Sequence, residues 1–186
     1  DQDPAVERMA GGLRDAGRTV LAVNLDIASE AAVQGLPERL GKWWPDLHVL
    51  VNNAGISPKH DGRKREVADM DLDEWRRVLD VNLTGSFLVT RTCLPVLKSH
   101  GWGRVVMITS QAARTRTPVP GAHYAATKSG MTGFARVLAG EVAPFGVTVN
   151  CVAPGRIESE MTAVTSGDVN AALAASIPAG RMGRVQ

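Results

Sequence analysis

The stretch LHVLVNNAG, residues 47–55, decides how the chain folds. Four of its first five residues are apolar, which is typical of a strand buried on both faces of a sheet. Similar apolar runs rich in β-branched residues cover residues 19–25, 104–108 and 147–153. The sequence therefore predicts four buried strands. In the quoted stretch, the polar and glycine residues of NNAG directly follow the strand.

Helical patterns separate these runs. We expect helices over about residues 4–16, 29–44, 71–98 and 123–143, with Pro37 ending or kinking the second. Strands that alternate with helices form parallel sheets with helices on both faces. The expected fold class is thus α/β, a doubly wound parallel sheet in three α/β/α layers. No repeat or linker divides residues 1–186, so we expect a single domain.

Composition excludes several classes of protein. The 186 residues are 44% hydrophobic and 22% charged with a net charge of +2, which indicates a folded domain and does not indicate a nucleic-acid partner. No apolar run reaches the about 18 residues of a membrane span, and no signal peptide opens the chain. Cys93 and Cys151 lack metal-type spacing near the four histidines. We expect a reduced, cytoplasmic protein without a membrane segment or a structural metal.

Polar and glycine residues follow all four predicted strands. They are Asp26, Asn52–Gly55, Ser110 and Pro154–Gly155. These residue types also favour turns, so one such coincidence would mean little. Ligands of parallel sheets bind at the carboxyl ends of the strands, so four together predict a binding crevice at this edge.

The stretch HYAATKSG, residues 123–130, carries the chemistry. It holds Tyr124, the one tyrosine of the sequence, four residues before Lys128. On a helix these two side chains share a face, and a nearby ammonium favours a phenolate. We therefore expect Lys128 to lower the pKa of Tyr124, so that the phenol can exchange a proton with a substrate oxygen. The alternative is an ordinary amphipathic helix with a solvated lysine.

Asn82 lies among apolar residues of the helix predicted over 71–98. Val78 and Leu79 precede it by four and three residues, so its amide points toward their apolar face. A buried amide must be hydrogen-bonded. Two interpretations remain open: Asn82 ties the helix to a neighbouring backbone, or it holds a water beside the site.

Six motifs occur in a fixed order along the chain: NLDI at 24–27, NNAG at 52–55, VNLTG at 81–85, VVMITS at 105–110, YAATK at 124–128 and VAPG at 152–155. In this order they resemble the short-chain dehydrogenase/reductase family, with a Rossmann-like fold. Single-domain members such as the β-oxoacyl-carrier-protein reductases and small alcohol and sugar dehydrogenases are most similar. The family's N-terminal glycine-rich turn and its last strand and helix are not in the sequence. We therefore expect a fragment, or the ordered part, of a longer chain.

The resemblance implies an NAD(P)-dependent oxidoreductase that interconverts a carbonyl and an alcohol. Tyr124 would be the catalytic acid/base, and Lys128 would lower its pKa and bind the nicotinamide ribose. Ser110 would hold the substrate oxygen. Asn82 would support a water that links Lys128 to solvent.

The resemblance also implies a cofactor site, to which Tyr124 and Lys128 contribute. Its other members fall into three groups: Asp26 and Ile27 at the adenine, Asn53, Ala54 and Gly55 along the adenosine, and Pro154, Gly155, Ile157 and Ser159 at the nicotinamide. Ser159 stands where the family often has a threonine that holds the carboxamide.

Asp1 bears on the choice between the two cofactors. In the family, the residue that ends the second strand faces the adenosine ribose, and a carboxylate there repels a 2′-phosphate. Counting back from the helix predicted at 4–16 places Asp1 at that position. We expect NAD as cofactor, with NADP as the alternative.

Several apolar residues on the helices predicted over 71–98 and 123–143 exceed what one sheet face needs; they are Trp75, Phe87, Met131, Phe134 and Leu138. In the family these helices pair between subunits, so we expect a homodimer or homotetramer. The expected ligand besides the cofactor is a small-molecule alcohol or carbonyl substrate. A non-catalytic dinucleotide-binding or regulatory protein remains the alternative, as does an isomerase or dehydratase that uses the cofactor transiently.

Overall fold

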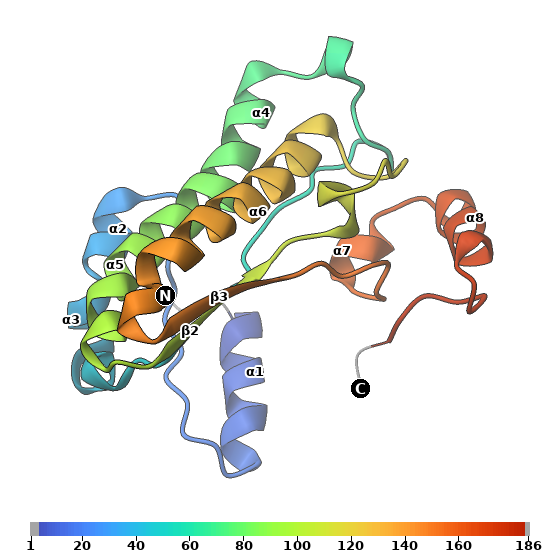
Figure 1. Cartoon of the computed structure of the whole chain (residues 1–186). Coiled ribbons are helices and arrows are strands. Elements are labelled where there is room, and N and C mark those ends of the chain that lie inside the picture. The colour runs from blue at the N-terminus through green and yellow to red at the C-terminus, as the bar shows by residue number, and fades with distance from the viewer. Residues whose placement is uncertain (1–3, 185–186) are drawn as a thin grey trace.

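Three parallel strands form the sheet, and the computed structural model describes residues 4–184. The helices and strands are α1 (Pro4–Asp15), α2 (Glu30–Gln34), α3 (Leu36–Leu40), β1 (Val49–Asn52), α4 (Leu72–Leu79), α5 (Gly85–Ser99), β2 (Gly103–Ile108), α6 (Ala122–Val142), β3 (Val147–Val152), α7 (Glu160–Ala163) and α8 (Gly167–Ser176). A π-helical turn, η3 (Asp80–Thr84), joins α4 to α5 without a break. Figure 1 shows this arrangement.

The strands lie in the order β1-β2-β3. In register, Val51 of β1 pairs with Val106 of β2, which pairs with Asn150 of β3. Side chains of β2 alternate between the two faces of the sheet, and Val105 and Met107 are fully buried on one of them. All three strands end at the same edge, which brings the segments that follow them together.

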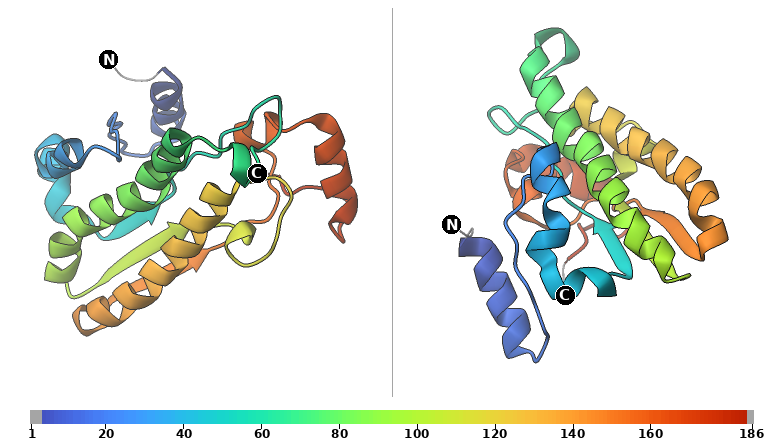
Figure 2. Two further views of the ribbon diagram at one scale, coloured as in Figure 1. Left: turned by 90° about the horizontal axis from the view of Figure 1, so that it is seen from above. Right: turned by 90° about the vertical axis from the view of Figure 1, so that its left-hand side faces the viewer.

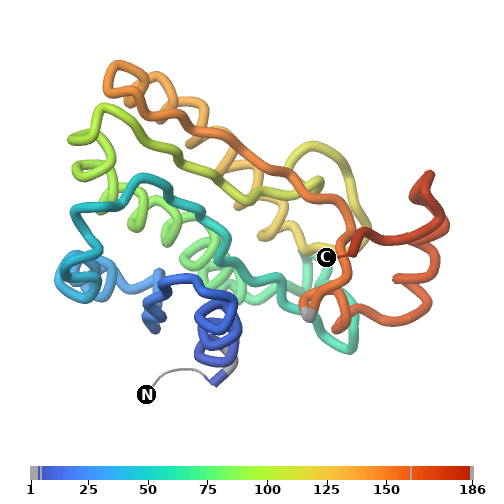
Figure 3. Tube along the Cα trace, turned by 90° about the horizontal axis from the view of Figure 1, so that it is seen from below, coloured from blue at the N-terminus to red at the C-terminus, as the bar shows by residue number. Residues whose placement is uncertain are grey.

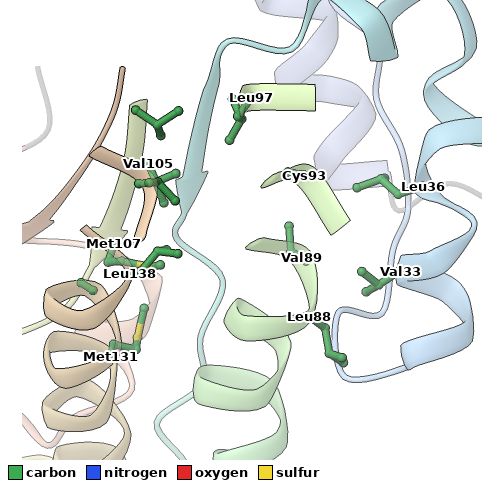
Figure 4. Packing of buried hydrophobic residues seen from close by; sticks show 13 residues of the cluster. Val33, Leu36, Leu88, Val89, Cys93, Leu97, Val105, Met107, Met131 and Leu138 are labelled. Carbon is green, nitrogen blue, oxygen red and sulfur yellow. The ribbon is translucent and has the colours of Figure 1, made fainter. Parts of the chain in front are cut away.

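Helices α5 and α6 cover one face of the sheet, and α1 lies on the other side (Figure 1 and Figure 2). The hydrophobic core fills the space between the sheet and α5, α6, α2 and α3 (Figure 4). Its buried members are Val33, Leu36, Leu88, Val89, Cys93, Leu97, Val105, Met107, Met131, Ala135, Leu138, Val142 and Val147. Burial of these side chains fixes α6 against β2 and β3, and α6 carries Tyr124 and Lys128.

The structure confirms the predicted fold class, a parallel sheet with flanking helices. The helices expected over 4–16 and 123–143 are α1 and α6. The one expected over 29–44 is interrupted at Gly35, and Pro37 lies in the first turn of α3, where its missing N–H is harmless. The helix expected over 71–98 runs from α4 through the π-helical turn into α5.

The strand expected over 19–25 is wrong. This segment forms no ladder with any strand of residues 4–184 and runs irregularly from α1 to α2 (Figure 3). Its Leu25 packs against the core, but Leu21 is 43% exposed, so the apolar run is only partly buried. A strand also needs a neighbouring backbone, and within residues 4–184 β1 is an edge strand whose ladder is formed with β2 alone.

The apolar residues expected at a subunit interface divide into a buried and a partly exposed group, and half-buried Trp75 of α4 belongs to the second. Met131 and Leu138 are buried in the core, so the expectation is wrong for these two. Phe87 is 41% exposed, and its ring packs edge-on against the half-buried ring of Phe134. Val137, also on α6, is 63% exposed. An apolar surface therefore remains on α5 and α6, although it is smaller than the sequence indicates.

Candidate active site

The segments that follow the three strands meet at the carboxyl edge of the sheet. The backbone N–H of Gln111, after β2, donates to the carbonyl of Pro154, after β3, at 3.0 Å. Gly55, after β1, lies against Lys128: a Cβ atom there would come within 3.4 Å of the lysine Nζ. The tighter contact would be with Asn82 Oδ1, at 3.3 Å, so the glycine keeps the backbone close to both Asn82 and Lys128.

Tyr124 and Lys128 lie one turn apart on α6, as the sequence predicts. The Lys128 Nζ is 5.6 Å from the centroid of the Tyr124 ring. Lys128 is only 3% exposed, and its ammonium donates to the carbonyl of Ile108 at 2.8 Å. Ser110 joins them from the end of β2 through a side-chain hydrogen bond to Tyr124. These three side chains therefore form one cluster.

The expected effect of Lys128 on Tyr124 is wrong for this structure. Burial raises the pKa of Tyr124 above its ordinary value of 10.0, and the hydrogen bond from Ser110 only partly opposes this. Burial also lowers the pKa of Lys128 from 10.5 to about 8. The ammonium donates to the Ile108 carbonyl, and burial of the phenol itself decides the direction of the Tyr124 pKa.

Asn82 ties its helix to a neighbouring backbone. It is fully buried in the π-helical turn, where its Oδ1 accepts from the N–H of Ile56 at 2.7 Å and its Nδ2 donates to the Ile56 carbonyl at 2.9 Å. Nδ2 also lies 3.3 Å from Thr127 Oγ1, which in turn donates to the carbonyl of Tyr124 at 2.8 Å. The first of the two sequence-based interpretations is therefore observed. Thr127 is a contact that the sequence reasoning missed.

The cofactor residues expected from the sequence lie on the loops around this cluster. Asp26 is exposed, and its carboxylate accepts from the N–H of Ala28 at 3.0 Å. Asn53 and Ala54 are exposed beside Gly55, and Ile27 is half-buried next to the core. Asp26 and Ile27 precede α2, and Asn53 and Ala54 directly follow β1.

The β3 side of the edge carries the remaining members. Pro154 and Ile157 are half-buried, while Gly155 and Ser159 are exposed. The Ser159 hydroxyl accepts from the N–H of Thr162 at 3.4 Å and so caps α7. Asp1 lies outside the described residues.

The donor set at the edge fits a nicotinamide dinucleotide. The Lys128 ammonium has three N–H groups, and within residues 4–184 it donates to the Ile108 carbonyl and lies 3.7 Å from the Met131 sulfur. A donor therefore remains for a ribose hydroxyl. Gly55 provides a backbone surface without a side chain directly beside that ammonium.

Sequence comparison agrees with this geometry. The sequence model of the family described as short chain dehydrogenase matches residues 1–170. The chain belongs to the short-chain dehydrogenase family.

Individual relatives and solved structures show which members of the family this short-chain dehydrogenase is similar to. It is 40% identical over 161 residues to the 3-oxoacyl-[acyl-carrier-protein] reductase of Aquifex aeolicus, covering 87% of this chain and 62% of that protein. It therefore spans about three fifths of that relative. The crystal structure of a 3-oxoacyl-[acyl-carrier protein] reductase from Brucella melitensis superposes with a TM-score of 0.91 at 38% identity, covering 99% of this chain and 68% of the other.

Other solved neighbours differ in the cofactor their descriptions name. A second 3-oxoacyl-[acyl-carrier protein] reductase structure from Brucella melitensis contains bound NAD. It superposes with a TM-score of 0.88 at 38% identity, and the match covers 99% of this chain and 68% of that one. A gluconate 5-dehydrogenase from Burkholderia cenocepacia was solved in complex with NADP and tartrate. It superposes with a TM-score of 0.84 at 27% identity, and the match covers 99% of this chain and 71% of that one. The superpositions confirm the three-layer, Rossmann-like α/β/α fold.

Residues 4–184 contain neither a membrane-spanning helix nor a cluster of metal ligands. In this part of the chain no helix is both long and apolar enough to cross a membrane. The same residues hold no group of three or more histidine, cysteine, aspartate or glutamate side chains placed to bind a metal ion.

Proposed function

We propose that this short-chain dehydrogenase interconverts a carbonyl and an alcohol with NAD(P), and that Tyr124 is its catalytic acid/base. The observation that carries the proposal is the cluster of Ser110, Tyr124 and Lys128 at the carboxyl edge of the sheet. A phenol beside a hydroxyl and a buried ammonium is suited to moving one proton to or from a substrate oxygen. A purely structural role would not require an ammonium that is 3% exposed.

Each member of the cluster has a separate proposed task. Ser110 holds the substrate oxygen: its Oγ accepts the N–H of Ala112 at 3.1 Å, and its O–H, now hydrogen-bonded to Tyr124, would turn to the substrate oxygen. Tyr124 gives its proton to that oxygen during reduction and takes it back during oxidation. Lys128 binds the ribose and stabilises the phenolate that forms. The nicotinamide, when bound, supplies or accepts the hydride.

Asn82 acts in this proposal through the backbone of Ile56. Both polar atoms of its amide are used by Ile56 and Thr127, so the loop after β1 is fixed beside Lys128. A water that links Lys128 to solvent would then rest on this fixed loop. Replacing Asn82 should therefore disturb the position of the loop as well as proton transfer.

We propose NAD as the preferred cofactor, with the binding residues predicted from the sequence: Asp1, Asp26, Ile27, Asn53, Ala54, Gly55, Tyr124, Lys128, Pro154, Gly155, Ile157 and Ser159. The preference rests on Asp1, whose carboxylate would repel a 2′-phosphate. A comparison of kcat/KM for NAD and NADP, before and after Asp1→Ala, tests it. Equal efficiency with both cofactors in the unmutated enzyme would end this part of the proposal.

The substrate is proposed to be a small-molecule alcohol or carbonyl compound. Two classes come first because the similar proteins are 3-oxoacyl-[acyl-carrier-protein] reductases and gluconate dehydrogenases. We also propose a homodimer or homotetramer, supported by exposed Phe87 and Val137 on α5 and α6, and a cytoplasmic location. Both cysteines are free thiols, which is compatible with that compartment.

A cofactor screen tests the proposal directly. The protein is mixed with NAD or NADP and panels of alcohols and sugar acids, and with the reduced cofactors and 3-oxoacyl thioesters. Absorbance then reports the change in reduced cofactor. Turnover with at least one pair supports an oxidoreductase, and binding of the cofactor without turnover of any pair would favour the non-catalytic alternative.

A further inference from the structure

The first turn of α6 is closed by an unusual hydrogen bond. The first N–H groups of a helix have no partner within the helix and are usually satisfied by a side chain at the N-cap. Here the N-cap is Gly121, which has no side chain. Instead, the backbone N–H of Tyr124 donates to Nδ1 of His123 at 2.6 Å. The His123 ring therefore caps the turn that carries the proposed acid/base.

The His123 ring is itself held from two sides. Because Nδ1 accepts a hydrogen bond, the proton of a neutral imidazole is on Nε2, which lies 3.0 Å from Oε1 of Glu74. His123 is 1% exposed, and Gly121 lies directly beneath it: a Cβ there would come within 2.6 Å of the ring. The carboxylate holds the ring on one side, and the absence of a side chain at Gly121 leaves room for it on the other.

Glu74, in the first turn of α4, is a nearly buried carboxylate. Its side chain is 11% exposed. Burial alone would raise the pKa of Glu74, but hydrogen bonds with His123 and His60 and nearby positive charge outweigh burial, so the pKa lies below its usual value. Glu74 is therefore ionised at neutral pH and is a strong acceptor for both histidines.

The same carboxylate also holds the loop after β1. Nε2 of His60 lies 2.7 Å from Glu74 Oε2, and Nε of Arg65 lies 3.6 Å from the same oxygen. This loop borders a cavity of about 160 Å³, whose other side is lined in part by Val119, before α6. One side chain thus connects a loop beside a cavity with the turn of Tyr124.

We propose that Glu74 and His123 are positioning residues for Tyr124: Glu74 orients the His123 ring, the ring caps the Tyr124 turn, and Glu74 fastens the loop of His60 and Arg65 to the same point. The kinetic part of this inference rests on the proposed function, whereas the structural part does not. A displacement of about 1 Å at a reacting group can lower a rate about a hundredfold, so a fixed turn matters for proton transfer.

Hydrogen exchange of one amide tests the positioning without any substrate. Isotope-labelled tyrosine gives a single amide signal in this chain, that of Tyr124, because the sequence holds one tyrosine. His123→Asn keeps an acceptor near the place of Nδ1, whereas His123→Gln keeps only a group near Nε2. We expect Tyr124 N–H exchange to accelerate about tenfold or more in His123→Gln and Glu74→Ala, and to stay within about threefold of wild type in His123→Asn.

Kinetics supply the second readout. We expect Glu74→Ala and His123→Gln to lower kcat about tenfold or more at nearly unchanged KM for the cofactor, and Glu74→Gln, which keeps an acceptor for His123, to restore most of it. Asp73→Asn is the matched control: it removes the same charge from the adjacent residue of α4, whose side chain is 96% exposed, and should change neither readout.

Two results would overturn the inference. One is an unchanged exchange rate of the Tyr124 amide in both His123→Gln and Glu74→Ala. The other is a kcat that falls only in proportion to the folded fraction, which would mean a stabilising role alone. If Glu74→Ala does not fold, the two His123 variants decide. If the wild-type protein turns over no substrate, the proposed function fails. Exchange of the Tyr124 amide then still tests whether Glu74 and His123 fix the Tyr124 turn, because it needs no substrate.

Discussion

The buried ammonium of Lys128 should make the stability of the folded chain depend on pH. Its pKa is about 8 in the structure against 10.5 for an ordinary lysine, and at about 1.4 kcal/mol for each tenfold change this difference corresponds to about 3 kcal/mol. Between these two pH values the unfolded chain binds a proton that the folded chain has lost. The free energy of unfolding therefore rises with pH over this window, and the contribution is lost again as pH falls through 8.

Replacing Lys128 by methionine isolates this effect. Near neutral pH the variant no longer carries the cost of a buried charge, but it leaves the Ile108 carbonyl without its donor, which costs about 1–3 kcal/mol. We therefore expect Lys128→Met to be about as stable as wild type at pH 7 and about 2 kcal/mol less stable at pH 10. Lys59, whose pKa is also lowered to about 8 by burial, is present in both proteins and cancels.

Urea unfolding at a fixed protein concentration from pH 7 to pH 10 measures the difference. Lys42→Met, at an exposed position, is the control and should follow the wild-type curve. Parallel curves for wild type and Lys128→Met would refute the reasoning, because they would mean that Lys128 carries its charge at no cost in the folded chain.

Three further outcomes follow from the same contacts. The Tyr124 phenol should titrate above pH 10.0, and higher still in Ser110→Ala, when phenolate absorbance is followed with Tyr124→Phe as the blank; titration below 10.0 in wild type would contradict this. Asn82→Leu should lower the free energy of unfolding by about 2–4 kcal/mol, because it leaves both backbone groups of Ile56 unpaired, and a loss below about 1 kcal/mol in chemical denaturation would show that the loop relaxes. Phe87→Asp should dissociate the proposed oligomer in light scattering, and a wild-type monomer at micromolar concentration would reject the oligomer itself.

Local patterns were sufficient for most of the fold. The runs at 47–51, 104–108 and 147–153 became β1, β2 and β3 within about two residues, because buried parallel strands need continuous apolar sequence. The run at 19–25 has the same composition and forms no strand. Apolar composition favours a strand, whereas a ladder depends on which backbone lies alongside, and that is a property of the whole fold.

The candidate site shows the same division. The spacing of Tyr124 and Lys128 was enough to predict a shared helix face, and the motif order placed Ser110 beside them. The direction of the Tyr124 pKa was not predictable, because it depends on how deeply each group is buried. The contact of His123 with Glu74 joins residues 49 positions apart, and only the adjacency of His123 to Tyr124 could have drawn attention to it.

Turnover by Tyr124→Phe tests the central claim most directly. The substitution removes one hydroxyl and little volume, so circular dichroism should match that of wild type. Because general acid–base catalysis contributes about a hundredfold or more, we expect kcat to fall by at least that factor with the best cofactor and substrate pair from the screen. A folded Tyr124→Phe enzyme with kcat within about tenfold of wild type would contradict the assignment of Tyr124 as the acid/base.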